Sequence, residues 1–305
     1  MIRSLSFAGL LLSAFATSAA AQQSFKSADE AAAALASAAK AGDRAAILTV
    51  LGSDADDIVS SGDDVADKSI RERFVQAYDE KHQIEKHGDD QAMLVIGNDD
   101  FPFPIPLVRK SDAWQFDTAG GRQEILFRRV GENELYAIQV CFAYADAQEE
   151  YAGKDHGSGV GVYARRVVSH PGQKDGLYWP ASAGDDQSPL GELAAQATGE
   201  GYKVSGGHQP FHGYYYKILT RQGPHASGGA FDYVVKGRMM GGFALVAYPA
   251  EYGNSGVMTF VVNHQRMIFQ KDLGPHTAQL AEQITAFDPD SSWTKVEGND
   301  LLVQR

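Results

Sequence analysis

Histidines are the first candidates for chemistry, because histidine is the usual general base and a common metal ligand. The chain contains nine of them, and only His208 and His212 stand at a ligand-like spacing. Pro210 lies between these two and prevents the helical i, i+4 geometry in which a histidine pair binds zinc. No local motif offers further ligands, so the sequence predicts neither a metal site nor a cofactor.

Carboxylates are numerous, but their spacing does not place two of them on one face for acid and base work. The sequence has no G-x-S-x-G elbow, no P-loop and no G-x-G-x-x-G turn that leads into a helix. A hydrolase would therefore combine residues far apart in sequence, and the candidates are His212 with Asp175 or Asp232. The alternative role for these aspartates is a solvated surface or a bond to turn amides.

An unusual concentration of aromatic residues follows in the second half: Tyr178, Trp179, Phe211, Tyr214, Tyr215 and Tyr216. Aromatic rings beside arginine suit stacking on a sugar, a peptide or a flat ligand. The predicted ligand-binding residues are Trp179, Tyr215, His212 and Arg165. The competing interpretation is a plain sheet core with phenol groups at its rim.

The N-terminus has the pattern of a signal peptide, with Arg3, an apolar stretch and the small-residue run that ends at Ala21. Cleavage is expected after Ala21, which predicts a periplasmic or secreted protein. The apolar stretch is too short to span a bilayer, and no later window is long and apolar enough. We therefore expect no stable membrane insertion.

Composition narrows the possible functions further. The chain has 305 residues, of which 44% are apolar and 22% charged, as in ordinary globular proteins. Its net charge of −12 repels phosphate backbones and anionic lipids, so nucleic-acid binding is not expected. Cys141 is the single cysteine, which excludes an internal disulfide and fits a buried apolar role better than a reactive one.

In the first half, helices precede strands. Ser27 and Glu30 form a capping box before an alanine-rich helix, and Arg44 to Leu51 forms a second helical piece that Gly52 ends. Asp67 to Tyr78 has helical spacing, whereas Ala92 to Ile96 and Ala113 to Phe116 are short strand patterns.

The second half starts with the clearest helix of the chain, Glu132 to Tyr151, where Leu135, Ile138, Phe142 and Ala145 form one apolar stripe. A short helix is expected at Pro189 to Ala197, with Ser188 as its cap. Five strand patterns separated by glycine-rich turns follow, and they predict an antiparallel meander: Tyr214 to Thr220, Phe231 to Lys236, Gly242 to Tyr248, Val257 to Asn263 and Met267 to Lys271. A weak helix at Thr277 to Ala286 and a last strand near Leu301 to Val303 complete the chain.

Four long segments together resemble a family of exported bacterial proteins catalogued as domain of unknown function 2950. They are FPFPIPLVRKSDAWQFDT at Phe101 to Thr118, GLYWP at Gly176 to Pro180, PFHGYYYKILTRQGPHASGGAFDY at Pro210 to Tyr233 and GGFALVAYPAEYGNSGVMTF at Gly241 to Phe260. The resemblance covers nearly the whole chain after the signal peptide and implies no activity.

A second resemblance concerns the order of NELYAIQVCFAYADAQEEYA at Asn133 to Ala152, PLGELA at Pro189 to Ala194 and the later strands. This order is similar to that in the periplasmic part of type IV pilins and pseudopilins. In those proteins a helix crosses an antiparallel sheet, and the pattern YP-x-x-YG-x-SG marks the last hairpin. The N-terminal methylation motif and the filament-packing helix of pilins are missing, so the resemblance implies a fold and not a filament subunit. The first half is loosely similar to cone-shaped proteins of the nuclear-transport-factor-two kind.

The sequence thus predicts an α+β protein with a signal peptide at 1–21, an N-terminal domain of helices and a curved antiparallel hairpin at 22–130, and a pilin-like helix-on-sheet domain at 131–305. The preferred function is a non-catalytic binding or assembly module of the bacterial envelope. Its partner would be an envelope protein or a small-molecule, peptide or glycan ligand. The alternative is a periplasmic hydrolase that uses a histidine–aspartate pair.

Overall fold

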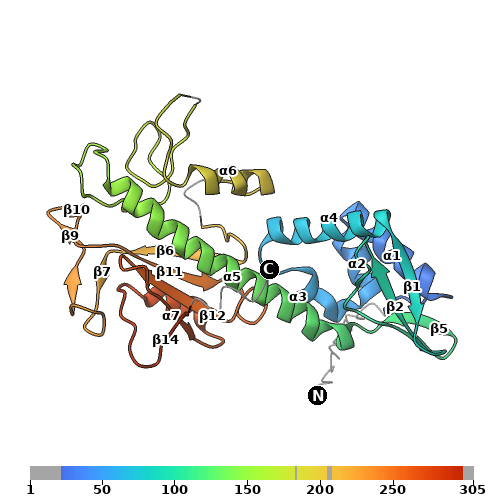
Figure 1. Ribbon diagram of the computed structural model, residues 1–305. Helices are drawn as coiled ribbons and strands as arrows, with labels where there is room; N and C mark the ends of the chain where they lie inside the picture. Colours follow the sequence, from blue (N-terminus) through green and yellow to red (C-terminus); the bar gives the residue numbers. More distant parts are fainter. Residues whose placement is uncertain (1–21, 183, 205–207, 298–305) are drawn as a thin grey trace, which may run out of the picture.

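The computed structural model describes residues 22–182, 184–204 and 208–297, and it combines helices with antiparallel sheets (Figure 1). The predicted α+β class is confirmed. The predicted signal peptide at 1–21 and the predicted strand near Leu301 to Val303 lie outside the described residues. Within the described residues, no helix combines the length and the apolar character that a membrane span requires.

The first half begins with four short helices and one turn of 3₁₀ helix: α1 (Ala28–Ala41), α2 (Arg44–Leu51), η1 (Ser53–Ala55), α3 (Asp56–Val59) and α4 (Asp64–Glu80). Side chains at the N-caps account for three of the starts, because Ser27, Asp43 and Asp63 each accept a hydrogen bond from an amide of the first turn. The predicted starts of α1 and α2 are confirmed, and α4 begins three residues before its predicted start.

The strands of the first half form one antiparallel sheet in the order β1-β2-β4-β5, with β3 paired to β2. Their bounds are β1 (His82–Lys86), β2 (Gln91–Ile96), β3 (Phe101–Pro102), β4 (Leu107–Lys110) and β5 (Ala113–Phe116). Leu94, Leu107 and Phe116 are fully buried and pack with α1 and α2 in a first hydrophobic core.

Helix α5 (Thr118–Ala152) joins the two halves and has 35 residues. It begins well before the predicted start at Glu132, so the proposed domain boundary between residues 130 and 131 falls inside it. Gly121 permits the early start, because a Cβ there would lie 2.6 Å from the Cα of Ile105. Ile125 and Leu126 of α5 pack on the first core, whereas the helix from Ala137 onward belongs to a second core.

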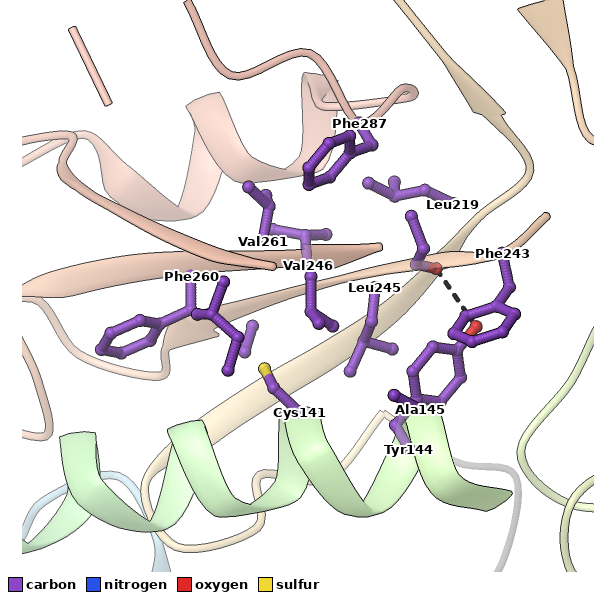
Figure 2. Close-up of a cluster of buried hydrophobic side chains, with 14 of the residues drawn as sticks. Cys141, Tyr144, Ala145, Leu219, Phe243, Leu245, Val246, Phe260, Val261 and Phe287 are labelled. Atoms are coloured by element: carbon purple, nitrogen blue, oxygen red, sulfur yellow. Dashed lines mark hydrogen bonds between the residues drawn. The ribbon is translucent and has the colours of Figure 1, made fainter. Parts of the chain in front are cut away.

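The second core is built on a five-stranded antiparallel sheet in the order β14-β13-β12-β11-β6. The strands are β6 (Tyr214–Leu219), β11 (Ala244–Pro249), β12 (Met258–Asn263), β13 (Ile268–Asp272) and β14 (Thr294–Lys295). Helix α5 covers one face, and α7 (Thr277–Gln283) packs on the same sheet next to β11. Figure 2 shows side chains of α5 pointing into one side of the sheet, with Phe287 and Leu219 on the other side.

One predicted strand is wrong. Residues 231–236 do not join the large sheet as a single strand but divide into β8 (Phe231–Asp232) and β9 (Val234–Val235). β8 pairs with β7 (Arg221–Gln222), and β9 pairs with β10 (Arg238–Met239) in a two-residue hairpin. Each half of the segment pairs with a different short strand, so the segment forms small two-stranded ribbons at one end of the sheet.

The buried face of α5 is shifted by about one residue from the predicted apolar stripe. Ile138 is 4% exposed, and Cys141 and Tyr144 lie beside it in the core, whereas Leu135 and Phe142 are only partly buried. Tyr144 Oη donates to the carbonyl of Ala244, as Figure 2 shows. Burial raises the pKa of the Cys141 thiol to about 12, which agrees with the predicted inert role of this cysteine.

A buried polar contact also ties the halves together. The guanidinium of Arg129 on α5 donates to the carbonyls of Asp57 and Ile58 and to the side chain of Asn254. Asn254 in turn donates to the carbonyl of Ser60 at 2.9 Å. A buried charge requires such partners, so the end of α3 and the loop after β11 are held on the same guanidinium.

Replacing Ile138 by alanine is expected to lower the free energy of unfolding by about 2–5 kcal/mol, because it opens a cavity where α5 meets the sheet. The matched control is Gln139→Ala on the exposed side of the same helix turn, which should change it by less than about 0.5 kcal/mol. Urea denaturation measures both. Equal values for the two variants would show that the seam does not support the fold.

Candidate functional site

A cavity of about 190 Å³ lies between α5, β6, the loop around Val167 and helix α6 (Gly191–Glu200). Its walls are mainly apolar, and six of the side chains represent the elements that form it: Val140, Val167, Tyr178, Leu193, Ala197 and Tyr216. Figure 1 shows α6 beside α5, on the side of that helix away from the large sheet. Regular elements therefore form most of the cavity wall, and a loop contributes the rest.

Helix α6 is held by backbone bonds and by small residues. The amide of Leu190 donates to the carbonyl of Leu177, and Ala194 and Ala197 are buried. The predicted cap at Ser188 is wrong, since Leu190 occupies the N-cap position and no side chain caps this helix. The helix begins at Gly191, two residues later than predicted.

His212 lies next to the cavity wall in a tight turn between Phe211 and Tyr214. His212 and Gly213 have φ values of 49° and 73°, and the backbones of Phe211 and Tyr214 bond to each other across them. Two successive positive φ angles are the pattern of a type I′ turn, which favours asparagine and glycine. Histidine in this position costs about 1–2 kcal/mol of backbone strain, so packing must hold it there.

The packing around His212 is specific. Its ring stacks on Tyr136 of α5 with 4.1 Å between centroids and meets Phe211 edge-on. Nε2 lies 3.0 Å from Oε2 of Glu200 at the end of α6. The histidine side chain is 14% exposed, so this contact is largely screened from water.

Asp63 connects this turn to the first half of the chain. Its Oδ1 accepts from the amides of Val65 and Ala66, which caps α4. Its Oδ2 accepts from Tyr202 Oη and from the amide of Gly213, both at 2.9 Å. Tyr202 Oη also accepts from the amide of His212 at 3.2 Å, so one buried carboxylate orders the turn from two directions.

Burial dominates the electrostatics here. It lowers the pKa of His212, and the carboxylates that face the ring, Glu200, Asp63 and Glu132, oppose this effect without reversing it. Burial also raises the pKa of Tyr202, to which the negative charge of Asp63 adds. At neutral pH the arrangement is therefore a neutral histidine and a neutral phenol beside carboxylates.

The two aspartates proposed as partners of His212 lie elsewhere. Asp175 bonds to His170, with 2.6 Å between Oδ2 and Nδ1, on an exposed loop. Asp232 is opposite Arg221, which follows the C-terminal end of β6, whereas His212 precedes its N-terminal end. The carboxylate next to His212 is Glu200, so the structure does not assemble either predicted pair.

The predicted ligand-binding residues are also dispersed. Trp179 is 5% exposed, and its indole donates to the carbonyl of Asp186. Tyr215 stacks on His208, and Arg165 Nη1 is 3.5 Å from the carbonyl of Gly237. Of the wider aromatic group, Tyr178, Phe211 and Tyr216 do meet, because all three line the cavity.

Glu200, Tyr202 and Asp63 are site residues that sequence reasoning missed. Asp63 has the signal of a helix cap, and Glu200 ends a helical pattern closed by Gly201 in the left-handed conformation. Nothing local indicates that the carboxylate at 63 would meet a phenol at 202. Within the described ranges, no group of three or more metal-binding side chains is found.

Replacing His212 by asparagine is expected to flatten the pH dependence of stability. The unfolded histidine protonates near 6.5 and the folded one at lower pH, so the wild type loses stability as pH falls through this window. The slope contributed by one histidine is at most about 1.4 kcal/mol per pH unit. Asparagine tolerates the positive φ, and its effect on the turn is independent of pH.

Urea unfolding of both proteins at pH 7, 6 and 5 tests this expectation. As the pH falls, the unfolding free energy of the wild type should decrease more than that of H212N. The difference between the two proteins should therefore shrink or change sign in the variant's favour. Parallel profiles would show that His212 ionises alike in the folded and unfolded chain.

The comparisons with known proteins identify a family but no activity. No curated protein and no solved structure matches the chain. The resemblance of the second half to pilins therefore stays a prediction. A family model described as "Protein of unknown function (DUF2950)" matches residues 22–296. Because this match extends from the first described residue almost to the last, the chain belongs to the DUF2950 family.

Proposed function

We propose that this protein is an exported bacterial envelope protein that works as a non-catalytic binding or assembly module, with the cavity beneath α6 as its binding site. The observation that carries the proposal is the apolar cavity itself. Ligand sites are typically concave and apolar with a few polar groups, and this one lies between helices and a sheet that position its walls.

The size of the cavity limits the group that it accepts. A dry cavity of about 150 Å³ lined by aliphatic and aromatic side chains binds benzene. The volume of about 190 Å³ found here therefore suits an aromatic group of one or two fused rings, or a short branched aliphatic group. Such a group fits an aromatic small molecule or an apolar side chain of a peptide better than a whole sugar.

The contacts of His212 favour binding over hydrolysis. A histidine that acts as a general base needs a ring nitrogen that faces the proton it takes up. Nε2 of His212 instead lies 3.0 Å from the carboxylate of Glu200, while the ring stacks on Tyr136 and meets Phe211 edge-on. The polar groups of the site bond mainly to one another, which suits residues that support the wall of a binding site.

Export and envelope location are part of the same proposal. They rest on the N-terminal pattern that ends at Ala21 and on the single cysteine of the chain. The net charge of −12 supports a protein or small-molecule partner over nucleic acid or anionic lipid.

Filling the cavity is expected to abolish binding of an apolar probe. Ala197→Phe places a ring in the cavity from α6, and the expected result is at least a tenfold loss of affinity for indole. Because the ring occupies existing space, the variant should not lose the 1–3 kcal/mol typical of an overpacked core. Titration with indole followed by NMR, together with urea unfolding, measures both properties.

The matched control is Ala195→Phe, which adds the same ring to an exposed position of the same helix. It should bind indole as the wild type does. If the wild type itself shows no shifts on adding indole, or if both variants bind equally well, the cavity is not a binding site.

A further inference from the structure

The hairpin of β9 and β10 lies at one end of the molecule. Lys236 and Gly237 join its strands, and their φ values of 49° and 79° make a tight two-residue turn. Segment 158–165, which follows the end of α5, runs beside the hairpin, because one of its amides donates to the carbonyl of Met239 at 2.8 Å. We call residues 158–165 and 234–241 together the tip. Figure 1 shows the hairpin far from the helices of the first half.

Apolar side chains are exposed on the tip. The exposed fraction is 68% for Val160, 50% for Val235 and 46% for Met240. Phe231, which is also exposed, lies next to them, because its ring is 3.5 Å from the position that a Cβ on Gly241 would take. Single exposed apolar residues are common on proteins, but several at one place mark an interaction site. The tip thus has the apolar part of a docking surface.

The charged side chains of the tip are all positive. Arg165, Lys236 and Arg238 are exposed, and the sequence of the tip contains no aspartate or glutamate. Arg238 donates to the carbonyl of Ser158 at 3.3 Å. Arg165 donates to the carbonyl of Gly237 at 3.5 Å. A backbone carbonyl carries no net charge, so these two contacts hold the guanidinium groups at the tip without neutralising them.

Two carboxylates border the tip in sequence, and each has partners of its own. Asp155 accepts from the amides of Gly157 and Gly159, both at 2.8 Å. Asp232 is opposite Arg221 in the pair of β7 and β8. The tip therefore keeps a positive charge although the chain as a whole is acidic.

Most of the negative charge of the chain lies at the other end of α5. Residues 22–117 contain 19 aspartate and glutamate side chains but 10 lysine and arginine side chains. Helix α5 has 35 residues and separates this part from the tip. Charges in solvent are largely screened beyond about 8–10 Å at physiological ionic strength. The net charge of −12 therefore describes the first half of the chain better than it describes the tip.

The shape and the charge of the tip indicate which partner it fits. A hairpin turn at one end of the molecule is convex, so a planar surface can reach it without contacting the first half. A bilayer interface accommodates apolar side chains without a complementary groove. Lysine and arginine close to anionic lipids add to the binding.

We propose that the tip docks on the surface of an anionic lipid bilayer. Val235 and Met240 enter the interface, while Lys236 and Arg238 lie close to the lipid phosphates. This docking is peripheral and needs no membrane-spanning segment. It goes beyond the proposed function, because it places the molecule on a membrane and does not involve the cavity.

Vesicle binding by the full chain after signal-peptide removal tests the proposal. The probes are vesicles of phosphatidylcholine with about 30% phosphatidylglycerol, an anionic lipid, and vesicles of phosphatidylcholine alone. Each cation near an anionic surface strengthens binding roughly fivefold, so the anionic vesicles should bind at least about tenfold more tightly. Sedimentation of the protein with the vesicles at physiological ionic strength measures both affinities.

The charge variant combines Lys236→Asn with Arg238→Gln. Asparagine before glycine is a preferred pair in this kind of turn, so the hairpin should keep its shape. The expected result is a loss of affinity for anionic vesicles of about 20-fold. The matched control combines Lys86→Gln with Lys110→Gln, which removes the same charge from exposed positions of the first half and should leave the affinity within about twofold.

The apolar variant combines Val235→Thr with Met240→Gln and keeps every charge. It should bind anionic vesicles at least about fivefold more weakly, because less apolar surface leaves water at the interface. Both side chains are exposed, so the urea midpoint should stay that of the wild type. This variant tests the proposal even if the charge variant does not fold.

Several outcomes would overturn the proposal. Equal affinity for the two kinds of vesicle would do so, and so would equal affinity of the charge variant and its control. Full binding by the apolar variant would show that no side chain enters the interface. Binding to neither vesicle would leave the tip as a site for an acidic protein. The proposed function of the cavity is tested separately by indole.

Discussion

The structure depends on one constraint, which is that a single helix must satisfy two hydrophobic cores. The N-terminal turns of α5 pack on the core of the first half, and the turns from Ala137 onward pack on the large sheet. A continuous helix fixes the distance and the rotation between these two contacts, because each residue adds a set rise and turn. The halves therefore hold a defined relative position without an extensive apolar interface between them.

Polar side chains at the junction complete what the helix begins. Arg129 on α5 and Asp63 before α4 are both buried, and each has several hydrogen-bond partners from distant segments. Buried charges are costly when a partner is missing, so these contacts select one arrangement of the halves more than they add stability. His212 and Tyr202 extend the same contacts to the rim of the cavity, which links the geometry of that site to the junction.

Local features of the fold were predictable, and features that depend on distant partners were not. The capping serine before α1 and the strand Ala113–Phe116 are encoded by neighbouring residues, and both were expected where they lie. The start of α5 was missed because residues 118–131 include three glycines, which weaken a helix pattern, although at Gly121 close contact with Ile105 is what requires glycine. Residues 231–236 have strand composition, but short partners on either side divide them.

The residues of the candidate site also divide into those that could be predicted from local sequence and those that depend on distant partners. His212 stood out from its sequence context, and three of the clustered aromatic residues do meet at the cavity. Glu200 and Asp63 could not be assigned, because their proximity to His212 arises only when the end of α6 and the N-cap of α4 meet the turn at His212. Alternation along β6 placed Tyr215 on the opposite face from Tyr216, which explains why residues adjacent in sequence belong to different surroundings.

The length of α5 has a consequence for the behaviour of the molecule in solution. A helix of 35 residues is roughly 52 Å long at 1.5 Å per residue. With a folded half packed on each end, the chain should tumble as one elongated particle, slower about its short axes than a sphere of equal mass. Rotational diffusion would then be anisotropic, in contrast to two domains that reorient independently about a flexible linker.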